Sequence, residues 1–199
     1  MAEKSIKRNI GAYATMLVSS LLSLLASLVL SIEAIKLAKN ADADLGCNIN
    51  AVISCGKVAS SWQSNLLGFP NPFIGLICES VVITVAIAGL MGVLFPKNFM
   101  KVALGVYGLG LIFAFWLFSQ SYFVIGAFCP WCLLVTFSTI TVFSSMLKIN
   151  IRDNTFNLSE ERFNKIETFF NRGFDNLIWV FIYSTLIVAV LVKYWPAIF

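Results

Sequence analysis

Long apolar stretches separated by short polar segments dominate the chain. A helix needs about 20 apolar residues to cross the hydrocarbon core of a membrane. Five stretches reach this length, and we expect transmembrane helices at about 10–35, 73–94, 100–120, 128–147 and 177–195. A cleaved signal peptide is the alternative for the first stretch, but its apolar run exceeds the roughly 7–15 residues of such peptides and lacks a convincing cleavage site. The pattern predicts an all-α integral membrane protein.

Two of the polar segments predict shorter helices of their own. The loop at 38–71 contains residues 55–67, whose apolar positions favour one amphipathic helix lying over the outer mouth of the bundle. The segment at 149–176 carries an apolar stripe at helical spacing, with Ser159 suited to the N-cap and Gly173 suited to the stop. We expect this second helix to lie on the inner membrane surface.

The composition agrees with a membrane protein and limits the chemistry. Hydrophobic residues make up 59% of the chain and charged residues 12%, whereas soluble domains carry about 25% charged residues. The net charge of +4 gives little support to nucleic-acid binding. The chain contains no histidine, which excludes a Ser-His-Asp or Cys-His catalytic site and any metal site built on imidazole. Cysteine is left as the main candidate for chemistry near neutral pH.

The basic residues predict how the chain crosses the membrane. Ten of the 14 Lys and Arg residues lie at the N-terminus, in the turn after the second stretch or in the segment after the fourth. Cytoplasmic segments are enriched in Lys and Arg. We therefore expect a multi-pass protein of the cell inner (cytoplasmic) membrane, with its N-terminus in the cytoplasm and its C-terminus outside. The other side carries only Lys36, Lys39, Lys57 and Lys193.

This orientation places four of the five cysteines on the outer side. Cys47 and Cys55 lie in the first outer loop, and Cys129 and Cys132 lie at the outer end of the fourth stretch. Disulfides form and persist in oxidising extracytoplasmic compartments. Cys78 lies within the second stretch, where a free cysteine usually acts as a small apolar residue.

The motif C-P-W-C at 129–132 is suited to thiol exchange. Cysteines three positions apart at a helix start share one face, and Pro130 fits the first turn. A helix N-terminus favours the thiolate, which is the nucleophile. A passive disulfide across two residues would add little stability. Zinc held by this pair together with Cys47 and Cys55 is a remaining alternative.

Two cysteine pairs on one side of a membrane suggest an electron relay. A soluble outer partner would reduce the loop pair, and the loop pair would reduce the membrane pair, each by attack of a thiolate on a disulfide sulfur. The sequence has no heme, flavin or nicotinamide motif, so a lipid-soluble quinone is the simplest final acceptor. The alternative for the loop pair is a purely structural disulfide.

The segments "CNINAVISCGKVASS", "NPFIGLI" and "CPWC", in this order, resemble the vitamin K epoxide reductase family, specifically its bacterial members. The resemblance covers about residues 10–148. It implies a four-helix bundle around a quinone, capped by the loop that carries the first cysteine pair, with a fifth helix as an addition. The implied parts are a catalytic domain at 1–148, a cytoplasmic linker at 149–176 and a fifth transmembrane helix at 177–199.

The resemblance also implies a role for each cysteine. Cys47 would exchange with the partner, and Cys55 would exchange with Cys129. Cys132 would react with the quinone ring. Because no thioredoxin-like domain is fused to this chain, the partner implied is a separate DsbA-like protein with a thioredoxin fold, and the quinone is menaquinone or ubiquinone.

Three polar residues lie at positions that the family uses near the quinone, two as matches and one as a departure. Ser61 matches a serine near the capping helix, and Asn71 matches an asparagine that hydrogen-bonds a quinone carbonyl. Thr136 stands where the family has a tyrosine, a departure that bears on hydrogen bonding at that side. Apart from the resemblance, Glu79 is a carboxylate inside a membrane span, which is costly and is by default a functional hypothesis. It would deliver a proton to the quinone, or it would serve as an interhelical hydrogen-bonding residue.

Three other functions remain open at this stage. The first is a DsbB-type oxidase, an unrelated bundle in which the order of the two cysteine pairs is reversed. The second is a non-catalytic membrane scaffold with structural disulfides. The third, a small transporter, lacks the broken helices or paired repeats typical of that class.

Overall fold

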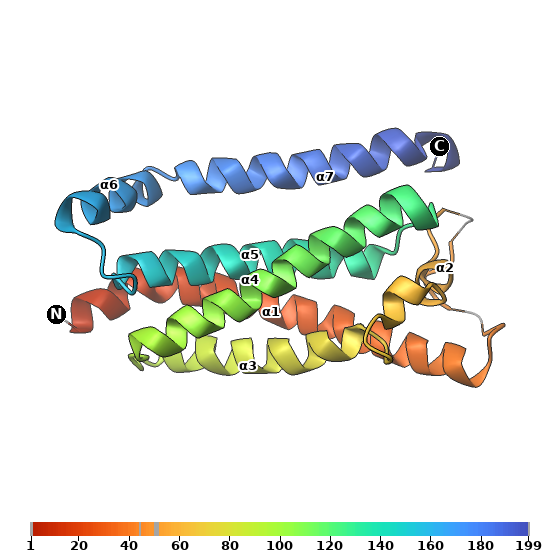
Figure 1. Cartoon of the computed structure of the whole chain (residues 1–199), viewed down its shortest axis with the longest axis horizontal. Coiled ribbons are helices and arrows are strands. Elements are labelled where there is room, and N and C mark those ends of the chain that lie inside the picture. The colour runs from red at the N-terminus through yellow and green to blue at the C-terminus, as the bar shows by residue number, and fades with distance from the viewer. Residues whose placement is uncertain (1, 44, 50–51, 199) are drawn as a thin grey trace.

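Five long helices form the protein in the computed structural model, which describes residues 2–43, 45–49 and 52–198 (Figure 1). They are α1 (Ala2–Lys39), α3 (Pro72–Leu90), α4 (Lys97–Gln120), α5 (Pro130–Arg152) and α7 (Phe174–Ile198). Each contains an apolar stretch long enough to cross a membrane. Successive long helices run in opposite directions along the molecule (Figure 1). The predicted all-α, five-span architecture is confirmed.

The first four long helices share one apolar core. Helix α1 packs between α3 and α5, and α4 packs on α5. Side chains that are fully or nearly fully buried meet in the middle of this group, among them Met16, Val82, Met100, Val142 and Ile149. Because membrane lipid is as apolar as these side chains, close van der Waals packing and interhelical hydrogen bonds, rather than removal from water, favour association of the four helices as one unit.

A glycine allows α1 and α3 to approach closely. A Cβ atom at Gly75 would lie 2.3 Å from Oγ and 3.0 Å from Cβ of Ser27. Small residues at helix contacts are the usual means of close packing inside membranes. The contact lies at the level of the cavity described below, because both residues line it.

Helix α7 lies along one side of the bundle and is joined to it through α6 (Figure 1). Leu186 packs against Leu111 and Ile140, and the hydroxyl groups of Tyr183 and Thr141 are 2.7 Å apart. These contacts fix α7 to α4 and α5.

The helix predicted between the fourth and fifth spans is present as α6 (Glu160–Asn171). Ser159 precedes it with extended backbone but makes no side-chain cap bond, and Gly173 follows with a positive φ of 74°. Arg8 Nη1 on α1 lies 3.0 Å from Glu167 Oε1 on α6. This contact holds α6 against the end of the bundle where the chain begins.

The single helix predicted at 55–67 is divided in two. Helix α2 (Cys55–Ala59) ends before Ser60, and a 3-10 turn, η1 (Trp62–Asn65), follows. The serines explain the break, because Ser61 Oγ donates to the carbonyl of Val58 at 2.7 Å. Such local bonds compete with the helical ladder.

Candidate active site

Main-chain hydrogen bonds bring the loop cysteines to the start of α5. The Phe128 N–H donates to Val52 O at 2.9 Å, and the Ser54 N–H donates to Phe128 O at 3.1 Å. These bonds form an isolated parallel bridge between Ile53 and Phe128. Cys55 follows one strand of the bridge and Cys129 follows the other, so the two sulfur atoms meet.

Asn48 also holds the segment around Cys55 in place, through its side chain. Its Oδ1 accepts hydrogen bonds from the Gly56 N–H at 2.9 Å and from Ser54 Oγ at 3.0 Å. The Ser54 hydroxyl in turn accepts from the Lys57 N–H at 3.1 Å and caps α2. The loop that carries the first cysteine pair is therefore fixed at the start of α2.

The four outer cysteines form one group, in which Cys47, Cys55 and Cys129 are buried and Cys132 is partly buried. Cys47 and Cys55 are joined in a disulfide, whereas Cys129 and Cys132 are free thiols. The Sγ atoms of Cys55 and Cys129 are 2.8 Å apart. Both residues are 1% exposed. A free thiol in contact with one sulfur of a disulfide is the arrangement from which thiol–disulfide exchange proceeds.

Cys129 has the electrostatic surroundings of an attacking thiol. It is the N-cap residue of α5, one position before the membrane-spanning stretch. A hydrogen bond from the Cys132 thiol lowers the pKa of the Cys129 thiol from its ordinary value; burial opposes this effect, and bonds from the backbone of Cys132 and Trp131 add to it. Because the thiolate is the nucleophile, the lowered pKa increases the reactive fraction at neutral pH.

The same cysteines bear on the zinc alternative. The sulfur atoms of Cys47, Cys55 and Cys129 lie within 4.8 Å of one another. Zinc is bound by thiolates, and the disulfide between Cys47 and Cys55 leaves Cys129 as the only possible thiolate of the three. In this oxidation state the donor set does not fit a zinc site.

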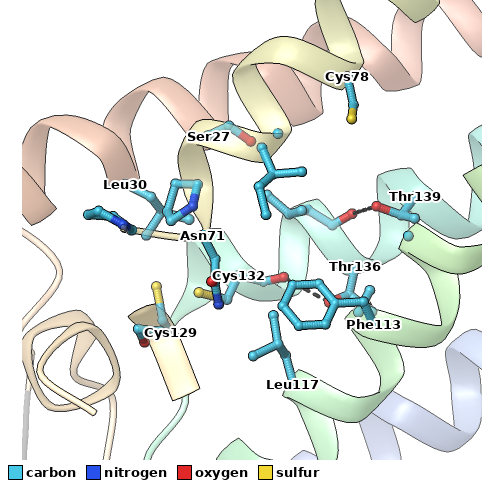
Figure 2. A pocket seen from close by; sticks show the side chains of 18 of the residues that line it. Ser27, Leu30, Asn71, Cys78, Phe113, Leu117, Cys129, Cys132, Thr136 and Thr139 are labelled. Carbon is cyan, nitrogen blue, oxygen red and sulfur yellow. Dashed lines mark hydrogen bonds between the residues drawn. The ribbon is translucent and has the colours of Figure 1, made fainter. Parts of the chain in front are cut away.

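An apolar cavity opens beside the cysteines (Figure 2). Its volume is about 790 Å³, and apolar side chains from α1, α3, α4 and α5 make up most of its wall. Cys129, Cys132 and Cys78 all line it, as Figure 2 shows. Pockets of this size and character bind small molecules, whose orientation is set by a few polar groups.

Asn71 is one of these polar groups. It is the N-cap residue of α3, and its Nδ2 donates to the Gln63 carbonyl at 2.7 Å. Its Oδ1 is buried with no hydrogen-bond partner among the described residues. Since Nδ2 carries two protons, the amide keeps one N–H beyond its bond to Gln63.

Thr136 lines the cavity, whereas Ser61 does not. The Thr136 hydroxyl donates to the Cys132 carbonyl at 2.9 Å, so toward a ligand it is left as an acceptor. Ser61 lies beside the wall that its neighbours Ser60 and Gln63 form. Roles for both Thr136 and Ser61 stay predictions.

Glu79 lies in the cavity wall, deep between the helices. It is 4% exposed, and its Oε1 accepts hydrogen bonds from Ser23 Oγ at 2.9 Å and from the Tyr107 hydroxyl at 2.8 Å. Its Oε2 is buried with no hydrogen-bond partner among the described residues. The hydrogen bonds agree with an interhelical role for Glu79, and its place in the cavity wall agrees with a role as proton donor. The structure is therefore compatible with both hypotheses.

Sequence reasoning missed a second buried carboxyl group, that of Glu33. Its two oxygens lie 3.1 and 3.3 Å from Cys47 Sγ, and the residue is 6% exposed. One signal in the sequence points to it, because it is the only acidic residue between Arg8 and Lys39. Its proximity to Cys47 follows only from the fold of the loop.

Sequence reasoning also missed two polar or aromatic parts of the wall. Gln63 is 2% exposed, lines the cavity and donates to Gln120 Oε1 at 3.3 Å. From α7, Val190 and Tyr194 reach the same cavity, and the Tyr194 ring packs on Phe128 with centroids 5.4 Å apart. Nothing in the sequence around Gln63 or Tyr194 indicates that their side chains line the cavity.

Comparison with known proteins agrees with the arrangement of cysteines and helices. A model described as "Vitamin K epoxide reductase family" matches residues 14–147. The matched part runs from α1 into α5 and contains all four outer cysteines, whereas α6 and α7 lie beyond it. A search of curated proteins found no match.

Proposed function

Because the chain belongs to the vitamin K epoxide reductase family and is therefore a membrane thiol–disulfide oxidoreductase, we propose that it oxidises an extracytoplasmic DsbA-like protein and passes the electrons to a membrane quinone. Its role would be to support disulfide formation in exported proteins. The family match removes the alternative of an unrelated DsbB-type bundle.

One observation carries the proposal. Cys55 Sγ of the loop disulfide lies 2.8 Å from Cys129 Sγ, and Cys132, one helical turn further on, lines the apolar cavity. Electron pairs therefore have a continuous path of sulfur atoms from the loop to a site that suits a quinone.

The cycle begins with both cysteine pairs oxidised. A thiolate of the partner attacks Cys47, and Cys55 leaves as a thiolate with the electron pair. Cys55 then attacks Cys129 of the membrane disulfide and releases Cys132. The second cysteine of the partner attacks the mixed disulfide, so that the partner leaves oxidised and Cys47 becomes a thiol.

The next step produces the state seen here. Cys47 attacks Cys55, the loop disulfide forms again, and Cys129 is released beside Cys132 as a dithiol. The quinone, menaquinone or ubiquinone, supplies a two-electron acceptor. The dithiol loses two electrons and two protons to it and returns to a disulfide.

Three residues of the cavity wall would hold the quinone and supply a proton. Asn71 has a free N–H that suits a quinone carbonyl, and Cys132 would lie against the ring. Glu79, with its unpartnered Oε2, would donate one of the two protons. The volume of about 790 Å³ and the apolar wall support this assignment.

The distribution of basic residues supports an orientation with the cysteines outside the cytoplasm. The N-terminus and α6 lie at one end of the molecule, and α2 and the C-terminus lie at the other (Figure 1). Ten of the 14 Lys and Arg residues belong to the segments of the first end. By the positive-inside rule, that end faces the cytoplasm of a cell with the protein in its inner membrane.

Quinone absorbance tests the proposal directly. Purified protein mixed with a reduced DsbA-like protein and a menaquinone analogue should bleach the quinone, and Cys132→Ala should abolish the bleaching because no dithiol remains beside the cavity. The scaffold alternative predicts that Cys132→Ala leaves disulfide formation in exported proteins unaffected. That result, or no bleaching by the unmodified protein, would contradict the proposed function.

A further inference from the structure

The Cys47 sulfur has a carboxyl group against it that the relay described so far does not use. Both oxygens of Glu33 lie within 3.3 Å of Cys47 Sγ. Cys47 belongs to an apolar cluster that includes Leu30, Leu37 and Leu45. Water therefore has little access to this sulfur, and Cys47 itself is 6% exposed.

Burial makes the fate of the proton on Cys47 important. Cys47 has to lose a proton before it attacks Cys55, and in the reverse step it leaves with an electron pair. An unpaired thiolate is costly in apolar surroundings. A thiol donates to a carboxylate, whereas a disulfide sulfur only accepts, so each oxidation state of Cys47 calls for a different protonation state of Glu33.

We infer that Glu33 is the general acid and base of the Cys47 sulfur. The inference rests on the proposed function and assigns a residue to one of its steps. In the forward direction the Glu33 carboxylate takes the proton of the Cys47 thiol. Cys47 then attacks Cys55, the bond between Cys55 and Cys129 breaks, and Cys129 leaves with the electron pair. In the reverse direction the Glu33 acid returns its proton to Cys47.

Few other titratable groups act on this pair. Lys36, one turn along α1, is the cation that acts on Glu33 among the described residues. Cys129 and Cys132, at the start of α5, are within electrostatic reach of Glu33. Neither of these thiols is placed against Cys47 by a described hydrogen bond, so Glu33 is the group in position to exchange its proton.

A single-turnover experiment isolates the step. Fully reduced protein carries four electrons in its outer cysteines and should reduce two quinone analogues in two phases. The first phase uses the dithiol of Cys129 and Cys132 directly. The second requires the relay, including the attack by Cys47, and Cys47→Ala should remove it. The first phase also reports whether a variant is folded.

Glu33→Gln should leave the first phase unchanged and slow the second by about 100-fold at neutral pH, the lower end of what a general acid or base contributes. The slowed phase should recover as the pH rises, because Cys47 then ionises without help. Glu33→Asp, which keeps the carboxyl group, should restore part of the rate.

Two outcomes would overturn the inference. One is a second phase of normal rate in Glu33→Gln. The other is a second phase slowed by the same factor at every pH, which indicates that Glu33 only anchors the loop. Absence of the first phase in the unmodified protein is a different result, which refutes the proposed function and with it the role of Glu33.

Discussion

At the residue scale, Glu79 has one oxygen with two hydrogen-bond donors and one with none. Ser23 and Tyr107 both donate to Oε1, while Oε2 lies buried in the wall of the cavity. A carboxylic acid carries its proton on one oxygen and accepts on the other. The two donors therefore favour Oε2 as the protonated oxygen.

Replacement of this acid tests its role. Glu79→Gln keeps the size and the acceptor oxygen but has no transferable proton, so it should slow quinone reduction by about 100-fold. Stopped-flow quinone absorbance with prereduced protein measures this rate. Exchange between the two cysteine pairs, followed on non-reducing gels after alkylation, should be unaffected. Quinone reduction at the normal rate would show that Glu79 is an interhelical hydrogen-bonding residue only.

At the scale of elements, the contact between α1 and α3 depends on the absence of a side chain at Gly75. The contact shapes the cavity, because Ser27 and Gly75 both line it. Helix α7 acts on the same cavity from the opposite side, through Val190 and Tyr194. The cavity is thus bounded by the four helices of the family bundle and by one helix beyond the matched region.

A methyl group at Gly75 should force α1 and α3 apart. Its Cβ would lie 2.3 Å from Ser27 Oγ, and overpacking of this kind costs about 1–3 kcal/mol. We expect Gly75→Ala to lower the thermal unfolding temperature in detergent, and the additional change Ser27→Gly to restore it. Gly105→Ala on α4 is the matched control, since a Cβ there would meet nothing within 4 Å. Equal stability of the two alanine variants would contradict this account.

At the scale of the whole molecule, the two ends differ in charge and in chemistry. Arg8, Asp153 and Glu167 gather at the end where the chain begins, and the four outer cysteines gather at the other. The proposed relay works only if the thiol partner and the outer cysteines lie on the same side of the membrane. The orientation of the protein is therefore part of its proposed mechanism.

Labelling of intact cells tests this orientation. A maleimide that does not cross membranes should label a cysteine introduced in place of Lys57, which is exposed on the outer loop. A cysteine introduced in place of Lys165 on α6 should be labelled only after the cells are broken. The reverse pattern would contradict the orientation and the choice of partner. Mass spectrometry of the labelled peptides distinguishes the two sites.

The sequence predicted the large elements well because a membrane span has a simple physical signature. About 20 apolar residues are required whatever the neighbours are, and all five spans were found within a few residues of their observed ends. The cysteine pairs were identifiable because their reactive chemistry is carried by one residue type. Tertiary contacts had no such signature: the proximity of Glu33 to Cys47 depends on how the loop folds back on α1, and that of Tyr194 to Phe128 on segments far apart in the sequence. The break of the loop helix at Ser60 likewise depends on hydroxyl bonds to Val58 that compete with the helical ladder.

The bridge between Ile53 and Phe128 sets a rule for redesign of the loop. Because its hydrogen bonds involve only the main chain, the side chains at 52 and 53 can change with little effect on where Cys55 lies, provided that Ser54, whose hydroxyl caps α2, is kept. The number of residues in this segment cannot change, because one inserted residue would shift the Cys55 sulfur by up to about 3.4 Å. This is more than the 2.8 Å that separates it from Cys129 Sγ. Insertions and deletions between Val52 and Cys55, rather than substitutions, are the changes that would disconnect the two cysteine pairs.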